Sequence, residues 1–226
     1  AWENLARKLA HEIKNPLTPI QLTIDKLKSK YSDKIADHEK DDFSKSLLII
    51  GKQIKQIENL VNEFSDFARM PKPILKDNNL VSLIKDNIKL INELDNKIII
   101  DFKSSTSDIF LNSDSEQLSR VFFNLIKNSI ESIQDKKIDN ANFSGKIDIS
   151  INENEEMINF IIIDNGLGFG TFKNDIKDIL NPYFTTKKKG TGLGLSIVNK
   201  IINDHNGKIN FVSLESGAKI EIVFIK

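Results

Sequence analysis

Cysteine is absent from this chain of 226 residues, and histidine occurs only three times. Without thiols the chain can form neither a disulfide framework nor a thiolate zinc site. His11, His38 and His205 are scattered, which argues against a histidine metal cluster, and we interpret His38 and His205 as exposed or satisfied core residues. Charge of one sign is not in excess, because 32 Lys and Arg balance 32 Asp and Glu. We therefore expect no nucleic-acid partner.

Long apolar runs are also lacking. No run of 18 apolar residues occurs, and the N-terminus has no signal-peptide pattern, so we expect no membrane contact within this chain. With 39% hydrophobic and 28% charged residues, the composition is typical of a folded globular protein. The chain begins at Ala1 inside a predicted helix without an initiator methionine, which indicates a fragment of a longer protein.

Two helical patterns occupy the first third of the chain. Apolar residues recur every three or four positions over residues 2–27, and a regular 4-3 spacing follows over residues 43–68. Such spacing is typical of helices that pack side by side in a bundle. Pro71 and Pro73 end the second helix. We therefore predict a helical hairpin over residues 1–73.

The second helix is apolar over more than one stripe. Leu48, Ile49 and Leu60 lie beside its regular positions. A single hairpin buries one stripe of each helix, whereas two hairpins packed as a four-helix bundle bury both faces. We therefore predict a homodimer whose hairpins form a four-helix bundle. The alternative is that these residues cover the second domain.

Strands and helices alternate after residue 73, which predicts a second domain over residues 74–226. The final two strands form an antiparallel hairpin, so a mixed α/β sandwich is favoured over a doubly wound parallel sheet. The predicted helices lie near 79–94 and 115–134 and after 190, and the predicted strands at 97–104, 108–112, 145–154, 156–164, 207–214 and 218–225.

The first polar cluster lies inside the first helix, in AHEIKNPLTPIQL. His11, Glu12 and Asn15 fall within about one turn, and His11 and Asn15 share a face. Pro16 and Pro19 remove the hydrogen bonds to the carbonyls of Glu12 and Asn15. Local strain of this kind is found at functional sites, so these three polar residues are candidate catalytic residues.

A second cluster lies in NLIKNSIES on a later helix. Asn124, Asn128 and Glu131 share one face at i, i+4 and i+7, opposite an apolar face. Amide oxygens suit Mg²⁺, which takes few protein ligands and binds phosphate oxygens. Because asparagine is common on exposed helix faces, this pattern alone is a weak signal.

The segment DNGLGFG directly follows a predicted strand. Asp164 can accept a hydrogen bond from the exocyclic amine of a purine, and Gly166 and Gly168 allow a flat ligand to approach the backbone. A plain glycine turn is the alternative.

The segment KKKGTGLGLSIV precedes an apolar helix. Gly190, Gly192 and Gly194 direct backbone N–H groups toward the helix N-terminus, where phosphates bind. The glycine spacing matches neither a Rossmann nor a Walker A loop. A flexible basic loop is the alternative.

Taken in order, these segments resemble the boxes of the sensor histidine kinases of two-component systems. The resemblance covers almost the whole chain. The segments AHEIKNPLTPIQL and NPYFTTK are most similar to NtrY-type nitrogen-regulation kinases. It implies a dimerisation and histidine phosphotransfer domain (1–73) followed by an ATP-binding domain of the Bergerat (GHKL) fold (74–226). The H, N, G1, F and G2 boxes are HEIKNPLTP, NLIKNSIES, DNGLGFG, NPYFTTK and GTGLGLS.

The resemblance implies an ATP-dependent protein histidine kinase from the cytoplasmic portion of a membrane-anchored sensor kinase. His11 would take the γ-phosphoryl group and pass it to an aspartate in a response-regulator receiver domain. Glu12 would be the base, and Asn15 would serve dephosphorylation of the regulator. Mg²⁺ would be bound by Asn128. The implied ATP-binding residues are Asn124, Asn128, Asp164, Gly166, Gly168, Thr186, Lys187, Gly190, Thr191, Gly192, Leu193 and Gly194.

One departure from the family pattern affects the phosphate contacts. Glu131 and Ser132 stand where many members have a lysine and an aromatic residue. The phosphate charge must then be offset by other residues, and Lys187, Lys127 and Arg120 are the candidates.

Two other functions are compatible with a GHKL fold. The chain could be an ATP-gated conformational machine, or a degenerate kinase that only scaffolds a regulator. HEIKN on a separate helical hairpin argues against the first. Intact Asp164, Asn128 and G2 glycines argue against the second.

Overall fold

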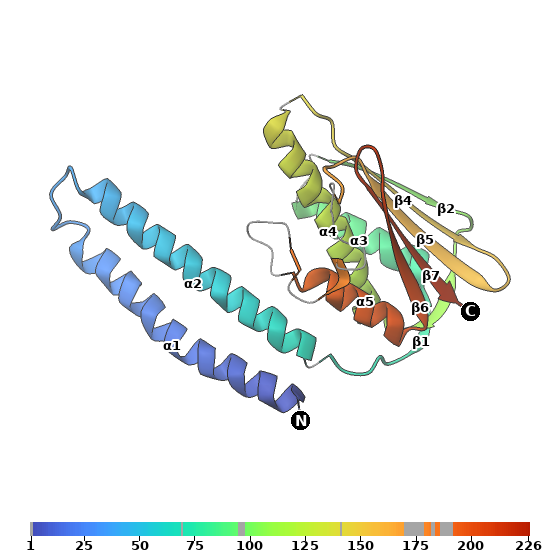
Figure 1. Ribbon diagram of the computed structural model, residues 1–226, viewed down its shortest axis with the longest axis horizontal. Coiled ribbons are helices and arrows are strands. Elements are labelled where there is room, and N and C mark those ends of the chain that lie inside the picture. Colours follow the sequence, from blue (N-terminus) through green and yellow to red (C-terminus); the bar gives the residue numbers. More distant parts are fainter. Residues whose placement is uncertain are drawn as a thin grey trace. The chain divides into compact units, whose positions relative to one another are not determined.

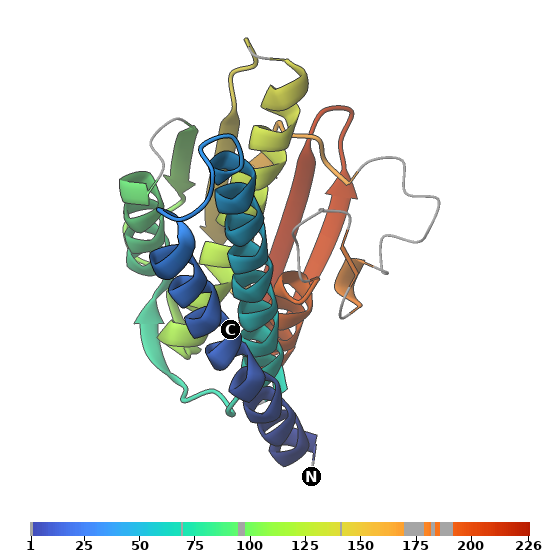
Figure 2. The ribbon, with the colours of Figure 1, turned by 90° about the vertical axis from the view of Figure 1, so that its left-hand side faces the viewer.

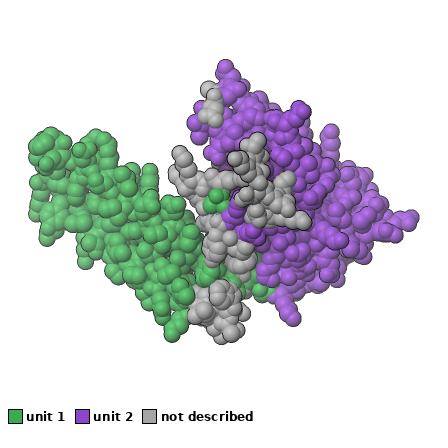
Figure 3. All heavy atoms as spheres, in the orientation of Figure 1, with its two compact units in different colours: residues 1–71, 185–193 green, residues 72–184, 194–226 purple. Residues whose placement is uncertain are grey.

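The computed structural model describes residues 2–68, 70–94, 98–140, 142–169, 179–181, 184–185 and 192–226. The chain divides into two compact units, which Figure 3 colours separately. One unit comprises residues 1–71 and 185–193, and the other comprises residues 72–184 and 194–226.

The first unit contains the predicted helical hairpin. Helices α1 (Trp2–Tyr31) and α2 (Lys40–Ala68) run antiparallel and pack along their length (Figure 1, Figure 2). α1 continues through Pro16 and Pro19 as one helix. The prediction of two helices from the apolar spacing is confirmed. Their shared core consists of Ile24, Leu47 and Ile54, with Leu17 and Phe43 packed against them.

The hairpin leaves many large apolar side chains exposed. Leu48 and Ile49 are 58% and 59% exposed. Burial of one such side chain contributes about 1.5–3 kcal/mol. Burial of this surface against a partner would therefore contribute a large favourable free energy of association. The other exposed members of this apolar surface are Leu9, Ile20, Leu22, Leu27, Ile50, Ile57 and Leu60.

The second unit is built on a five-stranded mixed sheet in the order β2-β4-β5-β7-β6. β2 pairs parallel with β4, and the other neighbours pair antiparallel, which confirms the predicted mixed sheet. A separate two-stranded ribbon joins β1 to β3. The bounds are β1 (Lys76–Asn79), β2 (Ile99–Ser104), β3 (Phe110–Ser113), β4 (Lys146–Glu153), β5 (Met157–Asp164), β6 (Gly207–Ser213) and β7 (Ala218–Ile225).

Helices α3 (Leu80–Leu94), α4 (Ser115–Asp139) and α5 (Gly194–Asp204) cover one face of this sheet (Figure 1, Figure 2). Every second residue of β5 is buried, as expected for a strand with one face on a core. Phe160 of β5 packs on Phe122 of α4 with ring centroids 4.9 Å apart. The predicted α/β sandwich is confirmed.

Asp114 fixes the start of α4 and the chain that enters this unit. Its Oδ1 accepts the N–H groups of Glu116 and Gln117, and its Oδ2 accepts the N–H of Ile74 at 2.9 Å. Burial acts to raise the pKa of Asp114, but these hydrogen bonds outweigh it, so the pKa is lowered. Asp114 therefore acts both as N-cap and as anchor for the segment after Pro73.

His205 is a satisfied core residue, as predicted. Its Nε2 accepts the N–H of Asp114 at 2.9 Å, and its Nδ1 lies 2.8 Å from the carbonyl of Ile201. A ring nitrogen that accepts carries no proton, so this arrangement assigns the ring donor to Nδ1. His38 is exposed.

The core of the second unit should depend strongly on Phe160, which has no exposed surface. Phe160→Ala is expected to lower the free energy of unfolding by about 3–5 kcal/mol, because a cavity replaces the ring. Ile138→Ala is the control, because Ile138 is 81% exposed and its loss should change stability by less than ~0.5 kcal/mol. Denaturant unfolding measures both, and equal effects would contradict the packing described.

Candidate functional site

The predicted residues of the H box lie on α1. His11, Glu12 and Asn15 are all exposed, and His11 and Asn15 share a helix face. Oε1 of Glu12 lies 4.0 Å from Nζ of Lys8, so the carboxylate turns toward the preceding helical turn. In the described part of the chain no hydrogen bond to the His11 ring is formed. An imidazole in this position is open to an incoming reactant.

Asp164 is the buried acidic group of the second unit. It ends β5 and is 5% exposed. Its Oδ1 accepts the N–H of Gly166 at 2.9 Å, and its Oδ2 accepts the hydroxyl of Ser129 at 3.1 Å. Burial raises the pKa of Asp164, and these hydrogen bonds partly oppose that effect. Because a carboxylate has about four acceptor positions, capacity remains for a ligand amine.

The loop after β5 packs closely against its neighbours. A Cβ on Gly166 would lie 2.4 Å from Oγ of Ser132, so only glycine fits there. Gly168 has a φ of +70° and Gly217, in the turn between β6 and β7, has a φ of +94°, a region that favours glycine. A Cβ on Gly217 would lie 1.8 Å from the carbonyl oxygen of Asp164. The loop and the turn therefore touch backbone to backbone.

The N box lies on α4 beside this loop. Asn124 and Asn128 are half-buried. Lys127 Nζ lies 3.9 Å from Glu131 Oε1, which partly offsets the charge of one candidate phosphate-binding lysine. The hydroxyl of Ser132 accepts the N–H of Leu167 at 3.0 Å. The departure from the family pattern at Ser132 therefore gives this chain a contact that fixes the loop.

The G2 box is only partly described. Gly192 has a φ of +72°, and α5 begins at Gly194. A Cβ on Gly194 would meet no described atom within 4 Å, so the described residues leave space at the helix N-terminus. Leu193 is buried. The predicted residues that lie outside the described ones are Thr186, Lys187, Gly190 and Thr191.

Several residues at the site were missed by the sequence interpretation. The helical spacing of NLIKNSIES puts Ser129 on the apolar face of α4, yet its hydroxyl donates to Asp164. A hydroxyl among apolar neighbours is the signal that could have indicated this. Lys136 of α4 contacts the loop after β5 and Ser216 in the β6–β7 turn. Nothing in the spacing of α4 indicates a contact with segments so distant in the chain.

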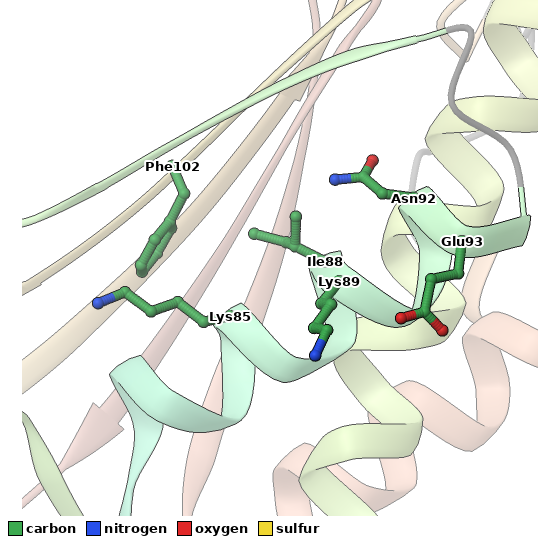
Figure 4. Close-up of a pocket in the computed structure, with 6 residues that line it drawn as sticks. All are labelled: Lys85, Ile88, Lys89, Asn92, Glu93 and Phe102. Carbon is green, nitrogen blue, oxygen red and sulfur yellow. The ribbon is translucent and has the colours of Figure 1, made fainter.

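A groove of about 400 Å³ lies elsewhere, between α3 and β2 (Figure 4). β2 is an edge strand, and neither element carries a predicted site residue. The groove therefore does not belong to the site around Asp164. It is lined by Lys85, Ile88, Lys89, Asn92, Glu93 and Phe102.

Two protein families match the chain. Residues 1–73 match the His Kinase A (phospho-acceptor) domain. Residues 113–226 match the family described as histidine kinase-, DNA gyrase B-, and HSP90-like ATPase. An NtrY-like sensor histidine kinase of Rickettsia felis is 38% identical over 225 residues, which are 99% of this chain and 36% of that relative. The chain therefore spans only part of the relative's length.

Two solved structures have a similar fold. The complex of histidine kinase ThkA with the response regulator protein TrrA gives a TM-score of 0.66 at 26% identity, over 99% of this chain and 61% of that one. Full-length ShkA in complex with AMPPNP gives a TM-score of 0.73 at 17% identity, over 99% of this chain and 46% of that one. The second likeness concerns the fold alone.

If Asp164 receives the exocyclic amine of adenine, Asp164→Asn should weaken nucleotide binding, because the amide can present a donor where that amine also donates. A mispaired buried polar group costs ~1–3 kcal/mol, so the affinity for ADP is expected to fall at least several-fold. Calorimetry measures this change. Asp86→Asn, at an exposed position on α3, is the matched control and should bind as wild type does. Wild-type affinity in Asp164→Asn would refute the role of this carboxylate.

Proposed function

This chain belongs to the sensor histidine kinases, and we propose that it phosphorylates its own His11 from ATP and passes the phosphoryl group to a response-regulator aspartate. The observation that carries the proposal is the pairing of an exposed His11 on a helical hairpin with a buried, hydrogen-bonded Asp164 in an ATPase-family domain. A phospho-acceptor domain is not needed by an ATP-gated machine, so the kinase is favoured.

ATP is proposed to bind beside α4 and the loop after β5. Asp164 accepts the adenine amine, and Gly166 and Gly168 let the base approach the backbone. Gly194 leaves space at the start of α5, where N–H groups attract phosphate. The remaining predicted residues complete the site in this proposal, namely Asn124, Asn128, Thr186, Lys187, Gly190, Thr191, Gly192 and Leu193.

Mg²⁺ is proposed to accompany the nucleotide. In the part of the chain that the structure describes, no three His, Cys, Asp or Glu side chains gather to hold a metal ion. A cation bound by one amide oxygen, water and phosphate oxygens fits such a site. The half-buried Asn128 of α4 offers that amide. When bound, the cation supplies charge stabilisation to the phosphates.

The chemical steps require little from the protein except positioning. A ring nitrogen of neutral His11 attacks the γ-phosphorus, and a P–N bond forms as the bond to the ADP oxygen breaks. The ring proton passes to Glu12 or to water. In the second step the aspartate carboxylate attacks phosphorus, the P–N bond breaks, and the imidazole regains a proton.

The partner is proposed to be a response-regulator receiver domain. The similarity to ThkA, which was solved with the regulator TrrA, supports this proposal. We further propose that the chain dephosphorylates the regulator. Asn15 lies one turn from His11 and is exposed, so its amide can orient a water for attack on an acyl phosphate, a reaction that mainly needs orientation.

The hairpin is proposed to form a homodimer, with residues 1–73 as the dimerisation domain and residues 74–226 as the catalytic domain. The exposed apolar side chains of α1 and α2 support the dimer, and the division of the chain after Pro71 supports the boundary. Within the described helices, none has the length and hydropathy required to cross a bilayer. The parent protein is proposed to be membrane-anchored, with this portion in the cytoplasm.

The histidine kinase activity can be tested with radiolabelled ATP. Wild type should take up label that is lost in acid and kept in alkali, as expected for phosphohistidine, whereas His11→Gln should take up none. His38→Gln is the control, because His38 is exposed in the α1–α2 connection and should be labelled normally. ADP affinity should be the same in all three proteins. Full labelling of His11→Gln would refute the assignment.

The dimer can be tested by sedimentation at micromolar concentration. The expected mass is twice the single-chain value of 25.7 kDa, because burial of the exposed Leu and Ile side chains outweighs the loss of rigid-body freedom. Leu48→Lys with Ile49→Lys places charge on this surface and should shift the mass toward one chain if these positions lie in the interface. A wild-type mass near 25.7 kDa would contradict the bundle.

A further inference from the structure

Lys136 lies near the C-terminal end of α4, and its ammonium group donates hydrogen bonds to backbone carbonyls and to a side chain in a turn. Its Nζ donates to the carbonyl of Asn165 at 2.7 Å, to the carbonyl of Gly166 at 3.0 Å and to Oγ of Ser216 at 2.7 Å. An ammonium has three N–H donors, so all three are satisfied. The same Nζ lies 4.5 Å from the ring centre of Phe143, within the range of a cation–π contact.

This lysine is directed by hydrogen-bond acceptors and not by an acidic partner. Among the described residues it forms no ion pair, whereas neighbouring cations such as Lys127 and Lys146 face carboxylates. Fixing a lysine side chain in one position costs side-chain entropy. Because no ion pair with a described residue offsets that cost at Lys136, its three hydrogen bonds must do so, which indicates a role in holding the segments that it joins.

Three segments meet at Lys136, and two of them are distant from it in the sequence. They are α4, the loop that follows Asp164, and the turn that contains Ser216 and Gly217. The loop and the turn already touch backbone to backbone, because Gly217 has no Cβ next to the carbonyl of Asp164. Such a contact leaves no room for a side chain between the loop and the turn. The ammonium of Lys136 supplies donors to both sides.

We propose that Lys136 is a positioning residue of the nucleotide site, which clamps the loop 164–168 and the turn 214–217 onto α4 in the conformation that receives the adenine. The inference rests on the proposed ATP site and names a residue that acts through the loop without contacting the ligand. A clamped loop loses less freedom when the ligand binds, so affinity increases without a new contact. The charge also acts on Asp164, where it opposes the rise in pKa caused by burial.

The decisive comparison uses Lys136→Met and Lys137→Met in the full chain. Lys137 is the next residue on α4 and makes no hydrogen bond or ion pair with the described residues, so it is a control of equal charge. Lys136→Met should lower the affinity for ADP about tenfold, as expected for loss of a charge-assisted contact, and Lys137→Met should not change it. Ser216→Ala, which removes one of three acceptors, should give a smaller loss.

Two further measurements separate positioning from general stability. Amide hydrogen exchange without nucleotide should accelerate at Gly166 and Leu167 in Lys136→Met, while exchange in α3 and β4 stays at the wild-type rate. In autophosphorylation the KM for ATP should rise while kcat at saturation is kept, because the phosphate end is unchanged. Lys136→Arg, which keeps the charge and donors, should recover part of the affinity.

Each outcome decides the proposal. Wild-type ADP affinity in Lys136→Met would overturn it, and so would a uniform rise in hydrogen exchange with equal losses in KM and kcat. If Lys136→Met does not fold, Lys136→Arg and Ser216→Ala decide, and unchanged affinity with unchanged exchange in both would overturn it. If wild type itself binds no ADP, the proposed ATP site fails, and accelerated exchange at Gly166 would still support the clamp.

Discussion

A carboxyl group can be kept out of water only where hydrogen bonds replace the lost hydration. Asp164 imposes this requirement on the second unit. The hydroxyl of Ser129 comes from α4, an N–H comes from Gly166 in the following loop, and the charge of Lys136 lies nearby. Helix, strand end and loop must therefore be in place together, and the helix layer is bound to the sheet by polar contacts as well as by the core.

The two units meet opposite requirements. In the proposed function His11 has to be reached by a phosphate donor and by a second protein, and it lies exposed on a helix whose own packing does not involve it. The proposed role of Asp164 is to distinguish a base by hydrogen bonds, which are strongest where water is excluded. A single compact domain would have to combine an open site with a closed one. A hairpin joined to a sandwich separates these demands between two bodies.

Much of the fold could be predicted from local patterns, because apolar spacing reports which face of an element is buried. The strand β1 was missed because KDNN has no apolar alternation, and its place is set by pairing with β3. Asp164, Gly166 and Gly168 could be proposed as site residues from the sequence, because the features that suggest them are local to one loop. Lys136 could not, because its partners lie 29 and 80 positions away in the chain, and only the fold brings them together.

The anchoring of Ile74 by Asp114 also limits the length of chain that links the two units. α2 ends at Ala68, so only residues 69–73 separate the last turn of the hairpin from a point fixed on the second unit. Five residues extend at most about 3.3–3.6 Å each, which sets an upper limit on the separation of these two points along the chain. A short tether raises the effective concentration of one reactant near the other to the ~mM range. In the proposed kinase, phosphoryl transfer within one chain would therefore not slow down when the protein is diluted.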